Sequence, residues 1–422
     1  MSNKLKIYKY YLKYKHRKFN SREELKKYQN KRIKNQIRFI KKYSKFYKKI
    51  KSNELKDFPI INKKIMMENF NDLNTIGINK EEALDFAINS EKTREFTNKL
   101  NGITVGLSSG TSDTRGIFLV SDNEKDKWAG YILAKYLGND LYKGCKIAFF
   151  MRADSNLYES LNSSQVQFKF FDIFKPMEEN IRCLEEFKPD ILVGQPSVLI
   201  EIAKNKRDVN PNKIISIAEV LEKKDEEYIK KAFKKDIIYQ IYQCTEGCLA
   251  TTCKYGTLHL NEDIVYVEKE YLDKDRFIPV ITDFTRKSQP IIRYRLNDIL
   301  VEGHEKCKCG LPFTIIKKIE GREDDIFVFY GKEGKNDVRV YPDFIRRCIL
   351  FAGDINNYRC VQITKDEVKI YMDGNDKLQE KIYDEFKKLS EQLNFKLPKI
   401  EFEKYFYDRK KKLKRVESLV KE

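Results

Sequence analysis

Lys146-Ile147-Ala148-Phe149-Phe150 is the stretch that decides the fold class. It is a short apolar run bounded by turns or charges, and similar runs follow at Ile191-Leu192-Val193 and Ile214-Ile215-Ser216-Ile217. Segments with helical spacing of apolar residues, such as 177–188 and 224–235, alternate with these runs. Short apolar strands alternating with helices are typical of an α/β domain with a buried sheet.

The pattern restarts after residue 325. Its elements are a strand-like run at Ile326-Phe327-Val328-Phe329, a helix led by Pro342, a second run at Val368-Lys369-Ile370-Tyr371 and a helix near 376–393. A chain of 422 residues also exceeds the roughly 250–300 residues at which one core stops growing. We therefore expect a large α/β domain over 58–323 and a smaller, mobile α+β domain over 324–422.

The N-terminal segment 1–57 is predicted to be helical, basic and packed on the large domain. Residues 1–50 hold 19 of the 83 basic residues and only two of the 64 acidic ones, so they carry +17 of the formal charge of +19. Ser21-Arg22-Glu23-Glu24 has the pattern of a capping box, and an apolar face follows it at Ile33, Ile37, Ile40 and Tyr47. The basic face predicts either a weak contact with an anionic surface or a solvated helix, and no specific nucleic-acid partner.

The sequence also indicates a compartment. No apolar run reaches the roughly 18 residues of a membrane span, and the N-terminus lacks the apolar core of a signal peptide. Nine cysteines without a secretory signal suggest a reducing cytoplasm, where thiols are free or bind metal.

The first chemical motif runs from Leu107 to Gly116 and reads Leu-Ser-Ser-Gly-Thr-Ser-Asp-Thr-Arg-Gly. Hydroxyl residues and glycines after an apolar run can wrap backbone N–H groups and hydroxyls around phosphate oxygens. The Gly-Lys-Ser/Thr ending of a P-loop is absent, and alone such a stretch is often an ordinary turn.

The other motifs follow in order. Tyr239–Gly247 supplies an aromatic ring at Tyr242 and ends in Thr-Glu-Gly, which supplies a hydroxyl and a hard carboxylate ligand for Mg²⁺. Thr282-Asp283-Phe284 precedes the stretch from Gln289 to Asp298, and an Asp that ends a strand can accept both ribose hydroxyls. The last motif is Ile319–Asp325, at the start of the second domain.

Together these four motifs resemble the adenylate-forming superfamily of acyl-CoA synthetases, adenylation domains and luciferases. In detail they are similar to the branch of phenylacetate–CoA ligases and CapK-type proteins, from about Phe58-Pro59-Ile60-Ile61-Asn62-Lys63 to the C-terminus. The resemblance implies an adenylate-forming enzyme fold that activates a carboxylic acid with ATP, releases pyrophosphate and then transfers the acyl group, with CoA as the expected co-substrate.

The resemblance also implies a role for individual positions. Thr245, Glu246 (the Mg²⁺ ligand) and Lys412 would be catalytic, with Lys411 as the alternative lysine, and Asp324 would be the hinge between domains. The residues expected to bind ATP or AMP are Ser108, Ser109, Gly110, Thr111, Ser112, Arg115, Ala218, Glu219, Tyr242 (stacked on adenine), Asp298 (on the ribose) and Arg322. The pocket for the acid is expected around Gly194-Gln195-Pro196-Ser197 and the stretch before Tyr242.

The sequence departs from the family in places. Asp113 and Gln243 stand where glycine is common, and a carboxylate at Asp113 puts loop geometry or nucleotide affinity in doubt. The Pro-Lys pair that ends the loop in many relatives is missing, and Arg115 is the residue that would compensate for it.

A metal site is predicted as well. Cys253, His259, Cys307 and Cys309 supply three thiolates and an imidazole, which suits a closed tetrahedral Zn²⁺ site. His304, Cys244 and Cys248 are competing ligands, and the plain alternative is a set of buried thiols. The same branch often carries a structural zinc built from similar pieces, and such a site would not take part in the chemistry.

Other functions stay open at this point. The acceptor could be CoA, a carrier protein or another nucleophile. A basic anion-binding protein on a decayed enzyme fold is possible, although Glu246, Asp298, Arg322 and Lys412 are all present. A zinc hydrolase would need an open metal position, which the cysteine-rich ligand set disfavours.

Overall fold

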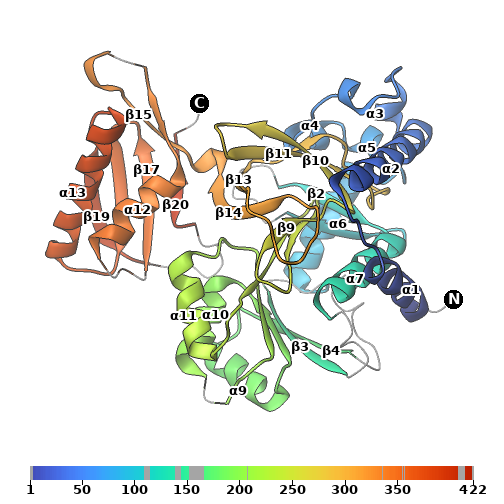
Figure 1. The fold of residues 1–422 in the computed structure, drawn as a ribbon, viewed down its shortest axis with the longest axis horizontal. Helices are drawn as coiled ribbons and strands as arrows, with labels where there is room; N and C mark the ends of the chain where they lie inside the picture. Colours follow the sequence, from blue (N-terminus) through green and yellow to red (C-terminus); the bar gives the residue numbers. More distant parts are fainter. Residues whose placement is uncertain are drawn as a thin grey trace. The chain divides into compact units, whose positions relative to one another are not determined.

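The structure is a computed structural model, and it forms two compact units. It describes residues 3–108, 115–137, 144–151, 166–206, 208–334, 336–353, 355, 357–406 and 414–420. Unit 1 consists of Met1–Asp275, Pro279–Leu296 and Glu302–Lys317, and unit 2 of Arg276–Ile278, Asn297–Val301 and Lys318–Glu422. Figure 1 gives the element labels used below.

A parallel sheet forms the centre of unit 1 and confirms the predicted α/β fold. Its strands lie in the order β4-β3-β5-β6-β7, and the three apolar runs of the sequence are β3, β5 and β6. The bounds are β3 (Cys145–Met151), β4 (Val166–Asp172), β5 (Ile191–Gly194), β6 (Lys213–Ile217) and β7 (Tyr239–Cys244). All four pairings between neighbours are parallel.

Helices cover both faces of this sheet, because successive strand residues point to opposite sides. Ala148 and Phe150 pack with α9 (Met177–Phe187), α10 (Pro196–Asn205) and α11 (Lys223–Phe233). Ile147 and Phe149 pack with α1 (Asn3–Lys15) and α7 (Asp122–Tyr136). Each such buried side chain stabilises the fold by roughly 1.5–3 kcal/mol.

Helix α1 lies close against α7 at Gly130. A Cβ atom added at Gly130 would lie 2.6 Å from Tyr10 Cβ and 2.8 Å from the Tyr11 nitrogen, so only glycine permits this approach. Nearby, the rings of Tyr14 and Tyr131 meet edge to face with centroids 5.0 Å apart. The first helix is therefore part of the unit 1 core.

Helix α2 (Arg22–Tyr43) has the apolar face that the sequence predicts. Ile33, Ile37 and Ile40 are buried along it. Ser21 is the N-cap and accepts a hydrogen bond from the Glu24 N–H, as predicted. The other half of the capping box differs, because the Glu24 carboxylate accepts from the Asn20 N–H rather than from Ser21.

The remaining elements of unit 1 lie around the parallel sheet. A separate hairpin pairs β1 (Thr104–Leu107) with β2 (Ile117–Val120). Antiparallel strands extend the main sheet beyond β7: β8 (Gly247–Thr252), β9 (Leu258–Leu260), β10 (Val265–Tyr271), β11 (Arg276–Asp283), β12 (Tyr294–Arg295), β13 (Asp298–Gly303) and β14 (Ile315–Arg322). Strands β11, β13 and β14 give residues to both units. The remaining helices are α3 (Lys45–Lys48), η1 (Leu55–Asp57), α4 (Lys63–Glu68), α5 (Phe70–Leu73) and α6 (Lys80–Thr93).

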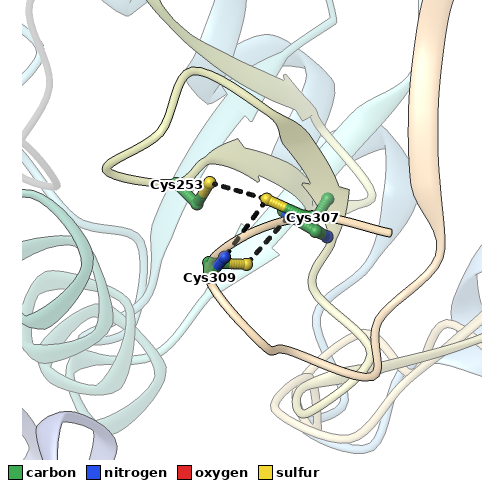
Figure 2. A group of neighbouring side chains, drawn as sticks. Cys253, Cys307 and Cys309 are labelled. Carbon is green, nitrogen blue, oxygen red and sulfur yellow. Dashed lines mark hydrogen bonds between the residues drawn. The ribbon is translucent and has the colours of Figure 1, made fainter. Parts of the chain in front are cut away.

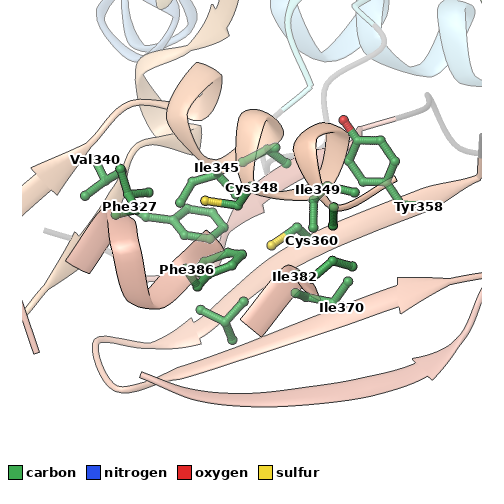
Figure 3. Packing of buried hydrophobic residues seen from close by; sticks show 14 of the residues in the cluster. Phe327, Val340, Ile345, Cys348, Ile349, Tyr358, Cys360, Ile370, Ile382 and Phe386 are labelled. Carbon is green, nitrogen blue, oxygen red and sulfur yellow. The ribbon is translucent and has the colours of Figure 1, made fainter. Parts of the chain in front are cut away.

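Unit 2 has the α+β structure that the sequence predicts. A four-stranded sheet in the order β19-β18-β17-β20 packs with α12 and α13 around a core that contains Phe327 and Phe386 (Figure 3). The bounds are η3 (Glu323–Asp325), β15 (Phe327–Phe329), η4 (Lys332–Gly334), β16 (Val338–Val340), α12 (Pro342–Ala352), β17 (Tyr358–Thr364), β18 (Glu367–Met372), α13 (Asp376–Leu393), β19 (Lys399–Lys404) and β20 (Val416–Ser418). The longest stretch of this unit begins at Lys318, and the division of the chain at 323/324 stays a prediction. None of the helices in the described ranges has the length and apolarity that a membrane span requires.

Candidate functional site

The predicted site residues of unit 1 gather where parallel strands end. Gln195 follows β5, Ala218 follows β6, and Thr245 and Glu246 follow β7. In open α/β sheets, ligands bind in the crevice outside the carboxyl ends of the strands. The fold therefore brings these segments to the edge at which a small ligand would be expected.

Ala218 has an unusual backbone conformation. Its φ is +65°, in the left-handed region that non-glycine residues seldom adopt. The Glu219 N–H donates to the Ile217 carbonyl at 2.8 Å, and the Ser197 hydroxyl donates to the Glu219 carboxylate at 2.9 Å. Such strain, about 1–2 kcal/mol, is commonly found at functional sites, where the backbone is held for a ligand.

Thr245 and Glu246 form the tight turn between β7 and β8. Cys244 pairs with Gly247 across this hairpin, and the Thr245 hydroxyl donates to the Glu246 carboxylate at 2.9 Å. The Tyr294 hydroxyl also hydrogen-bonds Glu246, and burial together with that carboxylate raises the pKa of Tyr294. Glu246 is thus oriented by two hydroxyls, and a carboxylate has further acceptor sites with which it could bind a hard cation.

Tyr242 and Gln243 precede this turn on β7. Tyr242, the predicted adenine-stacking residue, is buried in unit 1. Gln243 stands where the family commonly has glycine, and its side-chain oxygen accepts a hydrogen bond from the Trp128 indole at 3.0 Å. A side chain is therefore accommodated at this position by a partner on α7.

Arg286 ties the Thr-Glu turn to the β1–β2 hairpin. Its guanidinium donates to the Thr245 carbonyl at 2.9 Å and to the Leu119 carbonyl at 3.1 Å. Gln289 completes the link, because its amide donates to Ile117 O at 2.9 Å and accepts from Leu119 N at 3.1 Å. Both side chains are buried, so the two motifs are held at a fixed separation.

Glu124 joins α7 to the segment that contains Arg286 and Gln289. Its carboxylate accepts hydrogen bonds from Ser121, from the backbone N–H groups of Lys287 and Ser288 and from the Ser288 hydroxyl. Burial alone raises the pKa of Glu124, but Arg286 and these donors outweigh burial and lower it. The Ser121–Glu124 pair is also a capping box for α7.

The predicted phosphate loop has a closed base. The Ser108 N–H donates to Gly116 O at 2.7 Å, and the Gly116 N–H donates to the Ser108 hydroxyl at 2.8 Å. Arg115 pairs with both carboxylate oxygens of Glu91, at 2.6 and 2.5 Å. The other loop residues, Ser109, Gly110, Thr111, Ser112 and Asp113, lie outside the described residues.

Asp283, the strand-ending carboxylate of the third motif, is buried beneath the Thr-Glu turn. A Cβ atom at Gly247 would lie 2.8 Å from its Oδ2, so a larger residue at Gly247 would displace one of the two. Asp283 accepts from the backbone and hydroxyl of Thr285, both at 2.6 Å. Burial raises the pKa of Asp283. In this arrangement it supports the turn and is not exposed to a ribose.

Unit 2 carries the other predicted residues. The Arg322 guanidinium lies 3.9 Å from an Asp298 carboxylate oxygen. Asn297 donates to the Asp324 carboxylate at 2.7 Å, and the Glu323 N–H donates to Asn297 O at 2.6 Å. The fourth motif and the end of the third are thus neighbours within unit 2.

The predicted catalytic lysines, Lys412 and Lys411, lie outside the described residues. The chain beyond them is anchored, because Lys414 pairs with the buried carboxylate of Asp325 at 3.0 Å. Asp325 directly follows the predicted hinge Asp324. Lys414 is therefore joined to the fourth motif within unit 2.

The four predicted metal ligands come together in unit 1. One ligand atom from each of Cys253, His259, Cys307 and Cys309 lies within 4.8 Å of all the others. The Cys253 and Cys307 sulfurs are 3.6 Å apart, and Cys309 Sγ is 3.3 Å from His259 Nε2 (Figure 2 shows the three cysteines). Zinc bonds of about 2.3 Å to sulfur and 2.0 Å to nitrogen put tetrahedral ligand atoms roughly 3.5–3.8 Å apart. The donor set and its spacing therefore fit a closed structural zinc site.

The surroundings favour metal-binding protonation states at His259 and Cys307, whereas burial raises the pKa of the Cys309 thiol to about 12. His259 Nδ1 faces the Phe313 carbonyl at 3.4 Å, which can only accept, so the lone pair of Nε2 points to the cysteines. Burial lowers the pKa of His259, which keeps the imidazole neutral. Burial raises the pKa of Cys307, but its hydrogen bonds with the Thr257 hydroxyl and with the Cys309 N–H outweigh burial and lower it.

The competing ligands lie elsewhere. His304 pairs with Asp275 at 2.9 Å and is exposed. Cys248 is buried on β8, and its burial raises the pKa of the thiol to about 12. Cys244 bonds the Gly247 carbonyl at 3.7 Å.

Three residues that organise this site were missed in the sequence. Glu124 carries a local signal, because Ser121 and Glu124 have capping-box spacing. Arg286 and Gln289 lie inside or next to the third motif, but nothing local distinguishes them from solvated polar residues. Their partners lie more than 40 residues away in the sequence, and only the fold reveals them.

Comparisons with known proteins agree with the resemblance seen in the motifs. No family model matches the chain. Phenylacetate–coenzyme A ligase of Thermus thermophilus is 25% identical over 199 residues, which are 42% of this chain and 43% of that protein. Protein CapK of Staphylococcus aureus is 26% identical over 321 residues, which are 70% of this chain and 68% of that protein.

Solved structures agree on the fold. A 2-hydroxyisobutyryl-CoA ligase in the postadenylation state, in complex with R3-HIB-AMP, gives a TM-score of 0.69 at 14% identity, over 93% of this chain and 89% of that one. The amide bond synthetase McbA from Marinactinospora thermotolerans gives 0.54 at 12% identity, over 74% and 67%. The predicted fold and the similarity to phenylacetate–CoA ligases and CapK proteins are confirmed.

Proposed function

We propose that this chain, which has the fold of adenylate-forming enzymes and resembles phenylacetate–CoA ligases and CapK proteins, activates a carboxylic acid with ATP. The observation that carries the proposal is the arrangement around the Thr245-Glu246 turn. This turn lies at the carboxyl ends of parallel strands, and Arg286 bonds it to the hairpin that bears the Ser108–Gly116 loop base. A phosphate-binding loop and a cation-binding carboxylate are needed together for nucleotide chemistry.

In the proposed first half-reaction, a carboxylate oxygen of the substrate attacks the α-phosphorus of ATP. The bond between the α- and β-phosphates breaks, and pyrophosphate leaves. Glu246 would hold Mg²⁺, which would neutralise phosphate charge. Thr245 would contact the α-phosphate, and Lys412 would stabilise the charge that develops on the transferring group.

The same proposal assigns residues to the nucleotide. The Ser108–Gly116 loop would bind its phosphates, Ala218, Glu219 and Tyr242 would surround adenine, and Asp298 and Arg322 would contact the ribose and phosphate. In the second half-reaction the CoA thiol attacks the acyl carbonyl, and AMP leaves. Asp324 is proposed as the hinge for the change between the two half-reactions. The cysteine and histidine cluster would hold a structural zinc that fixes the loops after β8 and β13.

A panel of carboxylic acids, scored by pyrophosphate release with ATP and Mg²⁺, tests the proposal. We expect release with at least one acid, and we expect Glu246→Gln to abolish it. Assaying CoA and a carrier protein with the selected acid then identifies the acceptor. If no acid releases pyrophosphate while the purified chain is folded and metal-replete, the proposal is wrong.

A further inference from the structure

The exposed face of α2 carries a row of positive charge that the proposed function does not use. Lys27, Lys31, Lys34, Arg38 and Lys42 recur at helical spacing, and all five are exposed. At a rise of about 1.5 Å per residue, this row extends for about 22 Å. The acidic residues of α2, Glu23 and Glu24, lie in its first turn, and none follows in the sequence before Glu54, so the row beyond Lys27 has no acidic residue beside it on its own helix.

This row differs from the other basic residues of the segment. Arg22 pairs with Glu262, and Arg32 donates to the Phe284 carbonyl, so both serve to attach the helix to unit 1. Among the described residues, by contrast, no carboxylate lies within ion-pair distance of Lys27, Lys31, Lys34 or Arg38. Residues 51–422 nearly balance their charges, with a net of +2. A general excess of lysine would not be confined to the first 50 residues in this way.

The row is also held in place. Gln29 donates to Glu262 O at 2.9 Å and Gln36 to Arg286 O at 2.6 Å, and both amides are buried. The apolar side of α2 is buried in unit 1 and cannot be offered to a partner. The helix therefore presents a fixed surface that is mainly cationic.

Apolar side chains on α1 indicate which kind of polyanion this surface fits. Leu5 and Tyr8 are 54% and 36% exposed, and exposed Lys4 and Lys9 flank them. Leucine and tyrosine beside lysine suit the boundary between lipid headgroups and acyl chains, where both kinds of side chain are accommodated. Binding of single-stranded nucleic acid relies on several aromatic rings that stack successive bases. The exposed Tyr43 ring at the end of the row instead has the Lys42 ammonium 5.1 Å from its centroid.

We propose that the N-terminal helices dock unit 1 on a membrane surface rich in anionic lipid. Lys27, Lys31, Lys34, Arg38 and Lys42 would bind headgroup phosphates, and Leu5 and Tyr8 would enter the interfacial layer. The contact is peripheral and reversible, and it falls with ionic strength because exposed charges are screened. It does not depend on the proposed enzymatic function.

Flotation of the full chain with vesicles tests this inference. We expect the protein to float with phosphatidylcholine vesicles that contain phosphatidylglycerol, and not with phosphatidylcholine alone, and we expect high salt to release it. The variant Lys27→Gln/Lys31→Gln/Lys34→Gln/Arg38→Gln should lower partitioning by at least about tenfold. The control Lys64→Gln/Lys223→Gln/Lys231→Gln/Lys274→Gln removes the same charge from exposed positions elsewhere and should float normally.

Two further flotation experiments test the apolar contact and the alternative of RNA binding. Leu5→Ser/Tyr8→Ser should weaken flotation without changing its dependence on salt, since it removes no charge. Single-stranded RNA added at equal phosphate concentration should not displace the protein from anionic vesicles. The inference is overturned if the wild-type chain does not float at low salt, if the control variant loses as much binding as the α2 variant, or if RNA strips the protein from the vesicles.

Discussion

The polar residues around the Thr245-Glu246 turn of unit 1 and those around Asp298 and Arg322 of unit 2 are held very differently. In unit 1, Glu124, Arg286 and Gln289 are buried and make short hydrogen bonds to backbone groups of several segments. In unit 2, Arg322 and Asp298 are 3.9 Å apart, and Asp324 is exposed. The difference matches the division of roles in the proposed function, in which unit 1 would hold its part of the site in a fixed geometry and unit 2 would supply charges that can change partners.

The largest effect should come from the charge nearest the proposed chemistry. Lys412→Ala should lower pyrophosphate release by at least about 10³-fold, or about 4 kcal/mol in the barrier, because one preorganised cation is lost. The midpoint of thermal unfolding should hardly change. Lys411→Ala is the matched control and should keep most of the activity. Equal losses in the two variants would show that no single lysine of this run is catalytic.

Loss of a metal ligand should instead damage unit 1 itself. Cys309→Ser leaves three ligands, so we expect zinc to be lost and stability to fall by roughly 3 kcal/mol or more. Elemental analysis measures the zinc content, and thermal unfolding with and without a chelator measures the stability. Cys183→Ser, which changes a half-buried thiol on α9 outside the cluster, should retain the metal. If the wild-type chain, purified with zinc, contains none, the cluster is only a set of neighbouring thiols.

Glu124→Gln tests whether the buried hydrogen bonds of Glu124, Arg286 and Gln289 stabilise unit 1. The neutral amide cannot accept from all the donors that surround Glu124, so the free energy of unfolding should fall by about 2–3 kcal/mol. Glu178→Gln changes an exposed acid in the first turn of α9 and should shift stability by less than about 0.5 kcal/mol. Chemical denaturation of both variants provides the measurement.

The same carboxylate predicts a pH dependence. Its pKa is lowered in the folded chain from the ordinary 4.5, so its contribution is fully present above about pH 4.5 and is lost as pH falls through the folded value. Wild type should therefore lose stability on acidification more steeply than Glu124→Gln. If the free energy of unfolding changed with pH in the same way in both proteins, Glu124 would not be the source of this pH dependence.

The smallest effect is expected in unit 2. Asn297→Ala removes the hydrogen bond to Asp324, which is exposed, so stability should change by no more than about 0.5–1 kcal/mol. The ratio of thioester formation to pyrophosphate release should change instead, since Asp324 is the proposed hinge. A loss of stability as large as that of Glu124→Gln would remove the distinction between the two units.

Much of the fold was predictable because the signals are local. Apolar runs became β3, β5 and β6, a Pro342-led helix became α12, and the spaced cysteines and histidine came together. The arrangement of unit 2 was not predictable in the same way. Its residues 276–278 lie in β11 and 298–301 in β13, and the pairing of these strands depends on register between segments separated in the sequence.

The candidate site was predictable only in part, for a physical reason. Thr245 and Glu246 stand out because a hydroxyl and a carboxylate follow a strand, whereas Arg286 looks like any surface arginine until its carbonyl partners are known. The strained φ of Ala218 likewise has no signature in the sequence. Buried polar networks are built from side chains that meet only after folding, so they are the part of a site that sequence patterns miss.

The most direct test of the central claim follows an oxygen atom. The acid selected by the panel is labelled with heavy oxygen in its carboxylate and is turned over with ATP and CoA. Attack of the carboxylate on the α-phosphorus predicts that one labelled oxygen appears in AMP after the thioester forms and that pyrophosphate stays unlabelled. Label in inorganic phosphate, or ADP in place of AMP, would contradict activation through an acyl-adenylate.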